Sequence, residues 1–113
     1  MSKFDEAVAK YVAANKDLKL GLSDEYIRAV AKGLGPSIYR ADAELVSSSD
    51  QAELDTVKKN FLIKKLGLKD SPELDEAIDE VVEKMGRSNR NKYRALVYGL
   101  LAQKFNKESV YMK

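Results

Sequence analysis

Five apolar stripes constrain this sequence more than any other feature, because each is bounded by residues that begin and end helices. Within each stripe, apolar side chains recur three and four residues apart, which places them on one face of an α-helix. The stripes cover residues 3–16, 24–34, 51–66, 72–85 and 89–105. No stretch shows the two-residue alternation of a half-buried strand. The sequence therefore predicts an all-α fold, a compact bundle of about five helices.

Polar residues stand where these helices are expected to begin, because a Ser or Asp side chain can accept a hydrogen bond from a free backbone N–H. The predicted N-caps are Ser2, Ser23, Asp50, Ser71 and Ser88. Glu53 stands three residues after Asp50, which is the spacing of a capping box. Asn106 is expected to end the last helix. The pattern is weaker over residues 37–49 and fits one short helix, with the serines at 47–49 as turn and cap residues.

Length and composition indicate one globular domain covering residues 1–113, which is a common size for a single domain. Hydrophobic residues make up 44% and charged residues 34% of the chain, as in a folded rather than a disordered protein. No apolar run approaches the roughly 20 residues needed to span a bilayer. The N-terminus lacks the basic start and apolar stretch of a secretory signal. We therefore expect a cytoplasmic protein that does not enter a membrane.

The chain contains no cysteine and no histidine. Disulfides, thiolate metal sites and cysteine nucleophiles are therefore excluded, as are Ser-His-Asp triads and zinc sites that need imidazole. The glycine-containing stretch 33–37 follows a predicted helix and lacks the Lys-Ser or Lys-Thr pair of a phosphate loop. We expect no enzymatic activity, no metal and no cofactor.

The last two predicted helices present their side chains differently. At about 100° per residue, the apolar residues of 72–85 fall within one arc and the acids on the opposite side, so this is expected to be an outer helix. In 89–105, large apolar residues cover one broad side. Ala95, Gly99 and Ala102 line the other, where small side chains let another helix approach closely. We predict that this C-terminal helix is the central one.

Charge changes sign between these two helices, although the net charge of the chain is only +2. Residues 71–86 hold six acids against one lysine, a net charge of −5, and residues 87–113 hold seven bases against one acid, a net charge of +6. The acids form a candidate docking face for a basic partner. Its residues are Glu73, Glu76, Asp79, Glu80 and Glu83.

The basic segment 87–94 is the strongest candidate for a binding site. Bases at a helix start oppose the helix dipole, which favours anions there by roughly 0.3–1 kcal/mol per charge, so an anion is expected nearby. That anion is either internal, with Glu80 or Glu83 beside Arg87 or Arg90, or an external phosphate bound by free N–H groups, amides and guanidinium groups. The candidate anion-binding residues are Arg87, Ser88, Asn89, Arg90, Lys92 and Arg94.

Nucleic-acid binding is a further hypothesis for the same segment. A helix-turn-helix would place residues 87–94 at the start of the recognition helix, but the acids of the preceding helix would then face a polyanion. Lysines of the third helix form a secondary basic rim, which would extend the site if it lay beside 87–94. They are Lys58, Lys59, Lys64 and Lys65.

Four stretches resemble a known family: residues 32–39 (KGLGPSIY), 59–68 (KNFLIKKLGL), 85–94 (MGRSNRNKYR) and 107–111 (KESVY). They are similar to a family of small bacterial helical proteins known only as a domain of unknown function, family 2853. The resemblance implies a bacterial origin and a compact helical fold. It implies no activity and assigns no functional residue.

We therefore expect a non-enzymatic helical protein that binds another protein or a second copy of itself. The alternative is phosphate or nucleic-acid binding through residues 87–94 and the third-helix lysines. If Tyr98, Phe105 and Tyr111 are exposed together, they mark an apolar patch of the size of an interface.

Overall fold

Helices account for the regular structure of the computed structural model, which describes residues 2–112 and, of residues 41 and 42, the backbone alone. The elements are α1 (Lys3–Leu18), α2 (Asp24–Leu34), the 3₁₀-helix η1 (Gly35–Tyr39), α3 (Ala41–Glu44), α4 (Gln51–Thr56), the π-helix η2 (Val57–Lys65), α5 (Pro72–Met85), α6 (Arg94–Lys104) and the 3₁₀-helix η3 (Glu108–Val110). Over this range there is no strand, apart from an isolated antiparallel bridge between Leu45 and Tyr93. The predicted all-α class is confirmed.

The predicted helix ends are mostly where the capping residues placed them. Helices α2 and α5 have the predicted bounds, and Ser2, Ser23 and Asp50 each accept a hydrogen bond from a backbone N–H of the first turn. At α4 and α5, two expected capping contacts are absent although the capping residues stand at the predicted positions. The side chain of Ser71 caps nothing, and the capping box is not formed, because the carboxylate of Glu53 binds Arg94 instead.

Helix α4 continues directly into η2, so that residues 51–65 form nearly the single helix predicted over 51–66. The second half winds more widely than an α-helix, and the N–H of Leu66 donates to the carbonyl of Phe61, five residues earlier, at 2.9 Å. Val57, Phe61, Leu62 and Leu66 are buried on the inner side.

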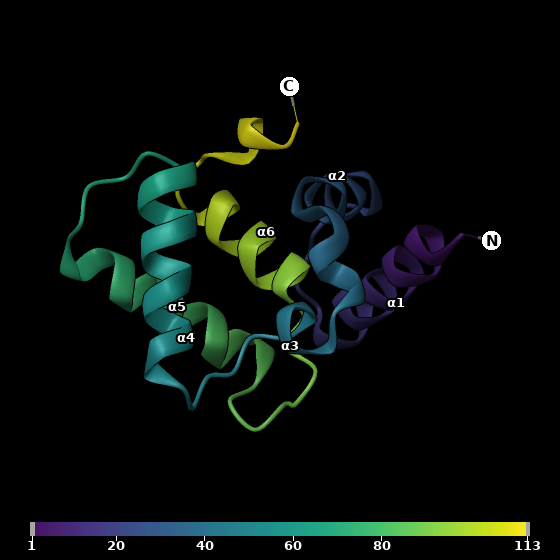
Figure 1. Cartoon of the computed structure of the whole chain (residues 1–113), viewed down its shortest axis with the longest axis horizontal. Coiled ribbons are helices and arrows are strands. Elements are labelled where there is room, and N and C mark those ends of the chain that lie inside the picture. The colour runs from purple at the N-terminus through teal and green to yellow at the C-terminus, as the bar shows by residue number, and fades with distance from the viewer. Residues whose placement is uncertain (1, 113) are drawn as a thin grey trace.

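Helix α6 begins at Arg94, five residues later than the predicted Asn89. It packs against α2 and α5, with further contacts to α1, α3 and η2 (Figure 1), and all its residues from 94 to 102 are buried. The expected close approach occurs at Gly99, where an added Cβ would lie 3.4 Å from the side chains of Leu22 and Tyr26. The hydroxyl of Tyr26 also donates to the carbonyl of Gly99 at 2.7 Å, which ties α2 to α6.

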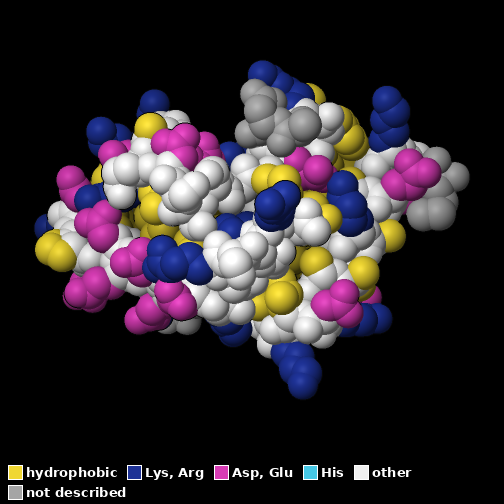
Figure 2. Space-filling model, turned by 90° about the horizontal axis from the view of Figure 1, so that it is seen from below, with side chains coloured by type: hydrophobic (Ala, Val, Ile, Leu, Met, Phe, Trp, Pro, Cys, Tyr) yellow, Lys and Arg dark blue, Asp and Glu magenta, His cyan; other side chains and the backbone are white. Residues whose placement is uncertain are grey.

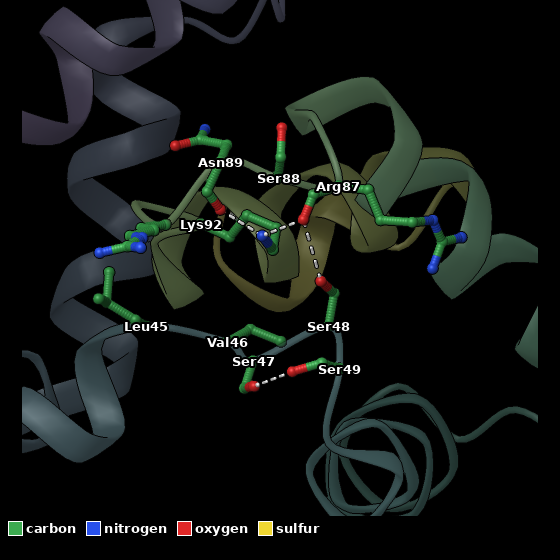
Figure 3. Close-up of a pocket in the computed structure, with 10 residues that line it drawn as sticks. Leu45, Val46, Ser47, Ser48, Ser49, Arg87, Ser88, Asn89 and Lys92 are labelled. Carbon is green, nitrogen blue, oxygen red and sulfur yellow. Dashed lines mark hydrogen bonds between the residues drawn. The ribbon is translucent and has the colours of Figure 1, made fainter.

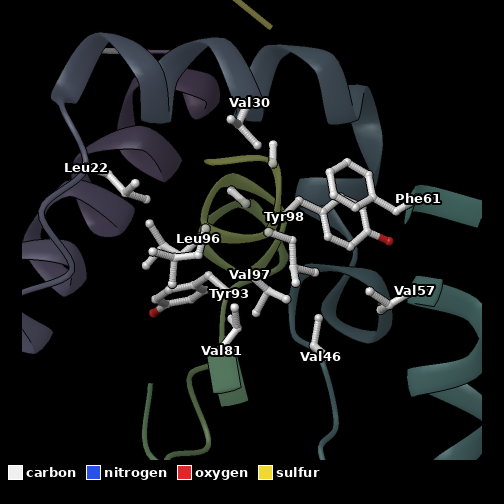
Figure 4. Close-up of a cluster of buried hydrophobic side chains, with 14 of the residues drawn as sticks. Leu22, Val30, Val46, Val57, Phe61, Val81, Tyr93, Leu96, Val97 and Tyr98 are labelled. Carbon is white, nitrogen blue, oxygen red and sulfur yellow. The ribbon is translucent and has the colours of Figure 1, made fainter. Parts of the chain in front are cut away.

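Buried side chains from most helices, α6 among them, form one hydrophobic core, part of which Figure 4 shows. The central position expected for the C-terminal helix stays a prediction. Phe61 of η2 stacks on Tyr98 of α6, with ring centroids 4.0 Å apart and an interplanar angle of 15°. Tyr98 is therefore buried, and Phe105 and Tyr111 are partly buried. The three side chains do not form an exposed apolar patch. Within the described part of the chain, no helix is both long enough and apolar enough to cross a membrane.

Candidate functional site

Residues 86–93 form a loop between α5 and α6, so the predicted helix start at Ser88–Asn89 is wrong. Asn89 explains the loop, because an Asn side chain offers the backbone hydrogen bonds that compete with those of a helix. Its Nδ2 donates to the carbonyl of Met85 at 3.0 Å, and its Oδ1 accepts from the N–H of Asn91 at 2.9 Å. Gly86 opens the loop with a φ of 93°. The bases of this segment therefore do not oppose the dipole at a helix start, with the exception of Arg94.

A cavity of about 420 Å³ lies between this loop and the connection from α3 to α4 (Figure 3). It is lined by Leu45, Val46, Ser47, Ser48, Ser49, Arg87, Ser88, Asn89, Arg90 and Lys92. Five of the six predicted anion-binding residues thus lie around one cavity, together with three serines that the sequence assigned only to a turn and cap. These serines form one wall of the cavity, the serine wall, and the basic loop forms the other. The run of three hydroxyl residues in the sequence is the signal that could have identified the serine wall.

Lys92 holds the two walls together and is 4% exposed. Its Nζ donates to the carbonyl oxygens of Arg87, at 3.1 Å, and of Asn89, and its own carbonyl accepts from the N–H of Val46 at 2.9 Å. Burial lowers the pKa of Lys92, and the charge of Arg87 lowers it further. No carboxylate of the described residues pairs with this ammonium group.

The serine wall supplies hydroxyl groups with weak internal bonds. Ser48 donates to the carbonyl of Arg87 at 3.4 Å, and the hydroxyl oxygens of Ser47 and Ser49 are 3.4 Å apart (Figure 3). These distances lie beyond the usual 2.5–3.0 Å of a hydroxyl–oxygen hydrogen bond. The three hydroxyls can therefore turn to a ligand with little loss.

Arg87 and Arg90 differ in their partners. The side chain of Arg87 points away from Lys92 and Ser48 (Figure 3), and it binds Glu83 at 2.6 Å and lies 3.6 Å from Asp79. The internal pairing expected for Arg87 is confirmed. Because its guanidinium group points away, only the backbone carbonyl of Arg87 faces Lys92 (Figure 3). Arg90 is exposed and pairs with no carboxylate in the described range.

Arg94 does not belong to the cavity, so its assignment to the anion site is wrong. It lies on the first turn of α6 with 11% of its side chain exposed. It donates to the carboxylate of Glu53, to the carbonyl of Ala43 and, at 2.9 Å, to the hydroxyl of Tyr98. These bonds join α3, α4 and α6, which gives Arg94 a structural role.

The third-helix lysines do not line the cavity either. Lys58 lies 3.0 Å from Asp70 and 3.1 Å from Asp75, and hydrogen bonds to both carboxylates raise its pKa. Lys65 lies over the ring of Tyr111, with its Nζ 5.3 Å from the centroid. Lys59 and Lys64 are exposed.

The acids of α5 are all exposed, and acidic side chains gather over the left part of Figure 2, where Figure 1 places this helix. Most of them pair with bases of this chain: Asp75 with Lys58, Asp79 and Glu83 with Arg87, and Glu80 with Lys104. Of the predicted docking residues, only Glu73 and Glu76 pair with no base of the described chain. The docking of a basic partner on this face stays a prediction.

Comparison with known proteins finds a family model that covers most of the chain. A family model described as a protein of unknown function (DUF2853) matches residues 3–109. No curated protein matches the chain. Among the described residues, no group of three or more acidic side chains is arranged to hold a metal ion.

Proposed function

The chain belongs to the DUF2853 family, whose description assigns no activity, and we propose from the site itself that it is a non-enzymatic protein that binds a phosphate-type oxyanion. The binding site is the cavity between residues 45–49 and 87–92. The observation that supports this most directly is the buried ammonium group of Lys92, which has no carboxylate partner among the described residues.

A buried cation without a counterion is costly, because burial removes most of its hydration. Two backbone carbonyls use two of the three donors of Lys92. An anion in the adjacent cavity would supply the missing charge and a third acceptor. The pKa of Lys92 is lowered by burial, as expected for an ammonium group without a counterion, and a bound anion would stabilise its charged form.

The other groups around the cavity suit a tetrahedral oxyanion. Arg90 supplies a guanidinium group that is free of internal ion pairs within the described chain, and guanidinium groups bind phosphate oxygens with two parallel hydrogen bonds. Ser47, Ser48 and Ser49 add hydroxyl donors from the opposite wall. Several donors around one concave site favour one compact anion.

The same charges argue against a nucleic-acid duplex. Duplex binding needs a row of bases that follows successive phosphates. Here the guanidinium group of Arg87 is already held by Glu83 and Asp79, so it is not free to pair with a phosphate of the duplex. The third-helix lysines lie outside it. A single phosphoryl group fits these charges better than a polyanion.

The test is a titration of the ¹⁵N-labelled protein with inorganic phosphate, followed by the amide shifts of residues 46–49 and 87–92. We expect saturable shifts in both segments. Arg90→Gln should weaken binding about tenfold, the effect of losing one charge-assisted hydrogen bond of about 1.5 kcal/mol. Lys59→Gln removes another exposed charge, one that does not line the cavity, and is the matched control, which should bind as the native chain does.

Two outcomes would contradict the proposal. The first is that the amide shifts do not saturate, or that Arg90→Gln and Lys59→Gln weaken phosphate binding equally. Either result would mean that phosphate responds only to the overall charge of the protein. A labelled random-sequence duplex at about 50 mM salt is the second arm. Strong duplex binding that Lys59→Gln weakens would replace the single-oxyanion site by a nucleic-acid surface.

A further inference from the structure

Tyr111, near the C-terminus, occupies a socket that other elements form. Its ring lies against α2 at Gly33, where an added Cβ would come within 2.7 Å of the ring carbon Cε1. The ring centroid is 6.4 Å from that of Phe61 in η2 and 6.5 Å from that of Tyr26 in α2. Nζ of Lys65 lies 5.3 Å from the same ring. The missing side chain of Gly33 thus makes room for a tyrosine ring.

The segment that carries Tyr111 is attached to the fold by this ring and its apolar neighbours. The hydrogen bonds of residues 108–112 stay within residues 107–112 throughout the described structure. The last bond to the helical body is from the N–H of Lys107 to the carbonyl of Ala102, at 2.7 Å. Just before it, Asn106 has a φ of 57°, a left-handed conformation that ends α6. The segment is therefore a short arm on a defined pivot.

The hydroxyl of Tyr111 adds a reason for the arm to detach. Its oxygen is buried and has no hydrogen-bond partner among the described residues, so the docked arm loses a bond that water would supply to the free arm. The socket binds the ring by shape and apolar contact, and docking leaves a polar group unsatisfied. Such a contact is reversible, and it does not depend on which chain supplies the tyrosine.

We propose that this socket is an interaction site for the C-terminal arm of a second copy of the chain, so that two copies exchange residues 107–112. The exchanged contacts are identical to those within one chain, which is the low-cost route to a dimer. Within one chain the arm is present at a high effective concentration, so the native protein is a monomer when dilute and exchanges arms when concentrated. The proposal is independent of the oxyanion cavity.

Two complementary variants test the exchange. Tyr111→Ala keeps an open socket but lacks the ring, and Gly33→Ala keeps the ring but fills the socket. We expect unlabelled Gly33→Ala, added to ¹⁵N-labelled Tyr111→Ala, to shift the amides of residues 31–34 and 61–66. The double variant Gly33→Ala/Tyr111→Ala is the matched control and should shift none of them. Sedimentation of the mixed single variants should show a dimer at concentrations where the native chain is a monomer.

Equal shifts from Gly33→Ala and from the double variant, or no shift from either, would overturn the proposal. Circular dichroism verifies that each variant is folded. If Gly33→Ala is not folded, a labelled peptide of residues 106–112 replaces it as the probe for full-length Tyr111→Ala. Binding of that peptide, lost when its tyrosine is replaced by alanine, supports the exchange, and equal binding of both peptides refutes it.

Discussion

Replacing Arg94 by methionine should lower the free energy of unfolding by about 3 kcal/mol. The guanidinium group binds a carboxylate, a backbone carbonyl and a phenol at the junction of α3, α4 and α6. A hydrogen bond between charged groups contributes about 1.5–3 kcal/mol and a neutral one about 1 kcal/mol. Methionine retains the apolar stem but leaves Glu53 without its partner. Since the side chain of Glu53 is 22% exposed, water satisfies part of this carboxylate, and the loss falls near the lower limit of the roughly 3–5 kcal/mol for a broken buried pair.

Urea unfolding followed by circular dichroism measures this loss, which corresponds to a fall in Tm of about 12 °C for a domain of this size. The matched control is Arg28→Met, because Arg28 pairs with Asp5 at 3.0 Å but the two side chains are far more exposed than those of Arg94 and Glu53, at 56% and 39%. That pair should contribute about 1 kcal/mol or less. A double-mutant cycle with Glu53→Gln should show a coupling of at least about 1 kcal/mol. If Arg94→Met costs no more than Arg28→Met, the structural role given to Arg94 is refuted.

Two further predictions concern buried polar groups. Asn15 is 6% exposed, and its amide donates to the carbonyl of Leu22 at 2.9 Å and accepts from the N–H of Leu22 at 3.1 Å. Asn15→Ala should therefore lower the free energy of unfolding in urea by about 2–3 kcal/mol. The same substitution at the exposed Asn60 should lower it by less than about 0.5 kcal/mol. The second prediction concerns Lys92, whose pKa is lowered in the folded state. Between that lowered pKa and the ordinary value of 10.5, the unfolded chain therefore binds more protons than the folded chain. The stability of the native protein relative to Lys92→Met should consequently rise as the pH increases through this window. A relative stability that is flat or falls up to about pH 10 would contradict the burial of an uncompensated ammonium group.

Local signals predicted the parts of the fold that depend on neighbours in sequence. Helix α5 has the predicted bounds because Pro72 and Gly86 act through their own backbone conformations. Helix α2 follows Ser23, whose hydroxyl accepts from the N–H of Tyr26 at 3.1 Å. The burial of the apolar arc of α5 and the exposure of its acids follow from helical periodicity alone. Such features need no knowledge of what the helix packs against.

The start of α6 could not be found in this way, because contacts distant in sequence decide it. Ser88 resembles an N-cap, but the chain from 89 to 93 is held by the isolated bridge from Tyr93 to Leu45 and by the hydrogen bond between Val46 and Lys92. These bonds keep Lys92 outside the helix and leave Arg94 in its first turn. Lys92 and Arg94, which belong to one basic cluster in the sequence, therefore differ in position: Lys92 lines the cavity, and Arg94 joins α6 to α3 and α4.

The same displacement explains why the serine wall was missed. Residues 47–49 lie about forty positions before the basic loop, and only the pairing of residues 45–46 with 92–93 brings them to the cavity. With a helix beginning at Ser88, the bases would have gathered around backbone N–H groups and the anion site would have been a helix terminus. Because residues 86–93 form a loop instead, Lys92 is buried between two irregular segments, and the site is a cavity in which the serine hydroxyls lie on the side opposite the basic loop. The pairing at Leu45 and Tyr93 thus brings the serine hydroxyls to the cavity beside the buried ammonium group. If the cavity binds phosphate as proposed, a substitution that breaks this pairing should abolish the saturable amide shifts without changing a base of the cavity.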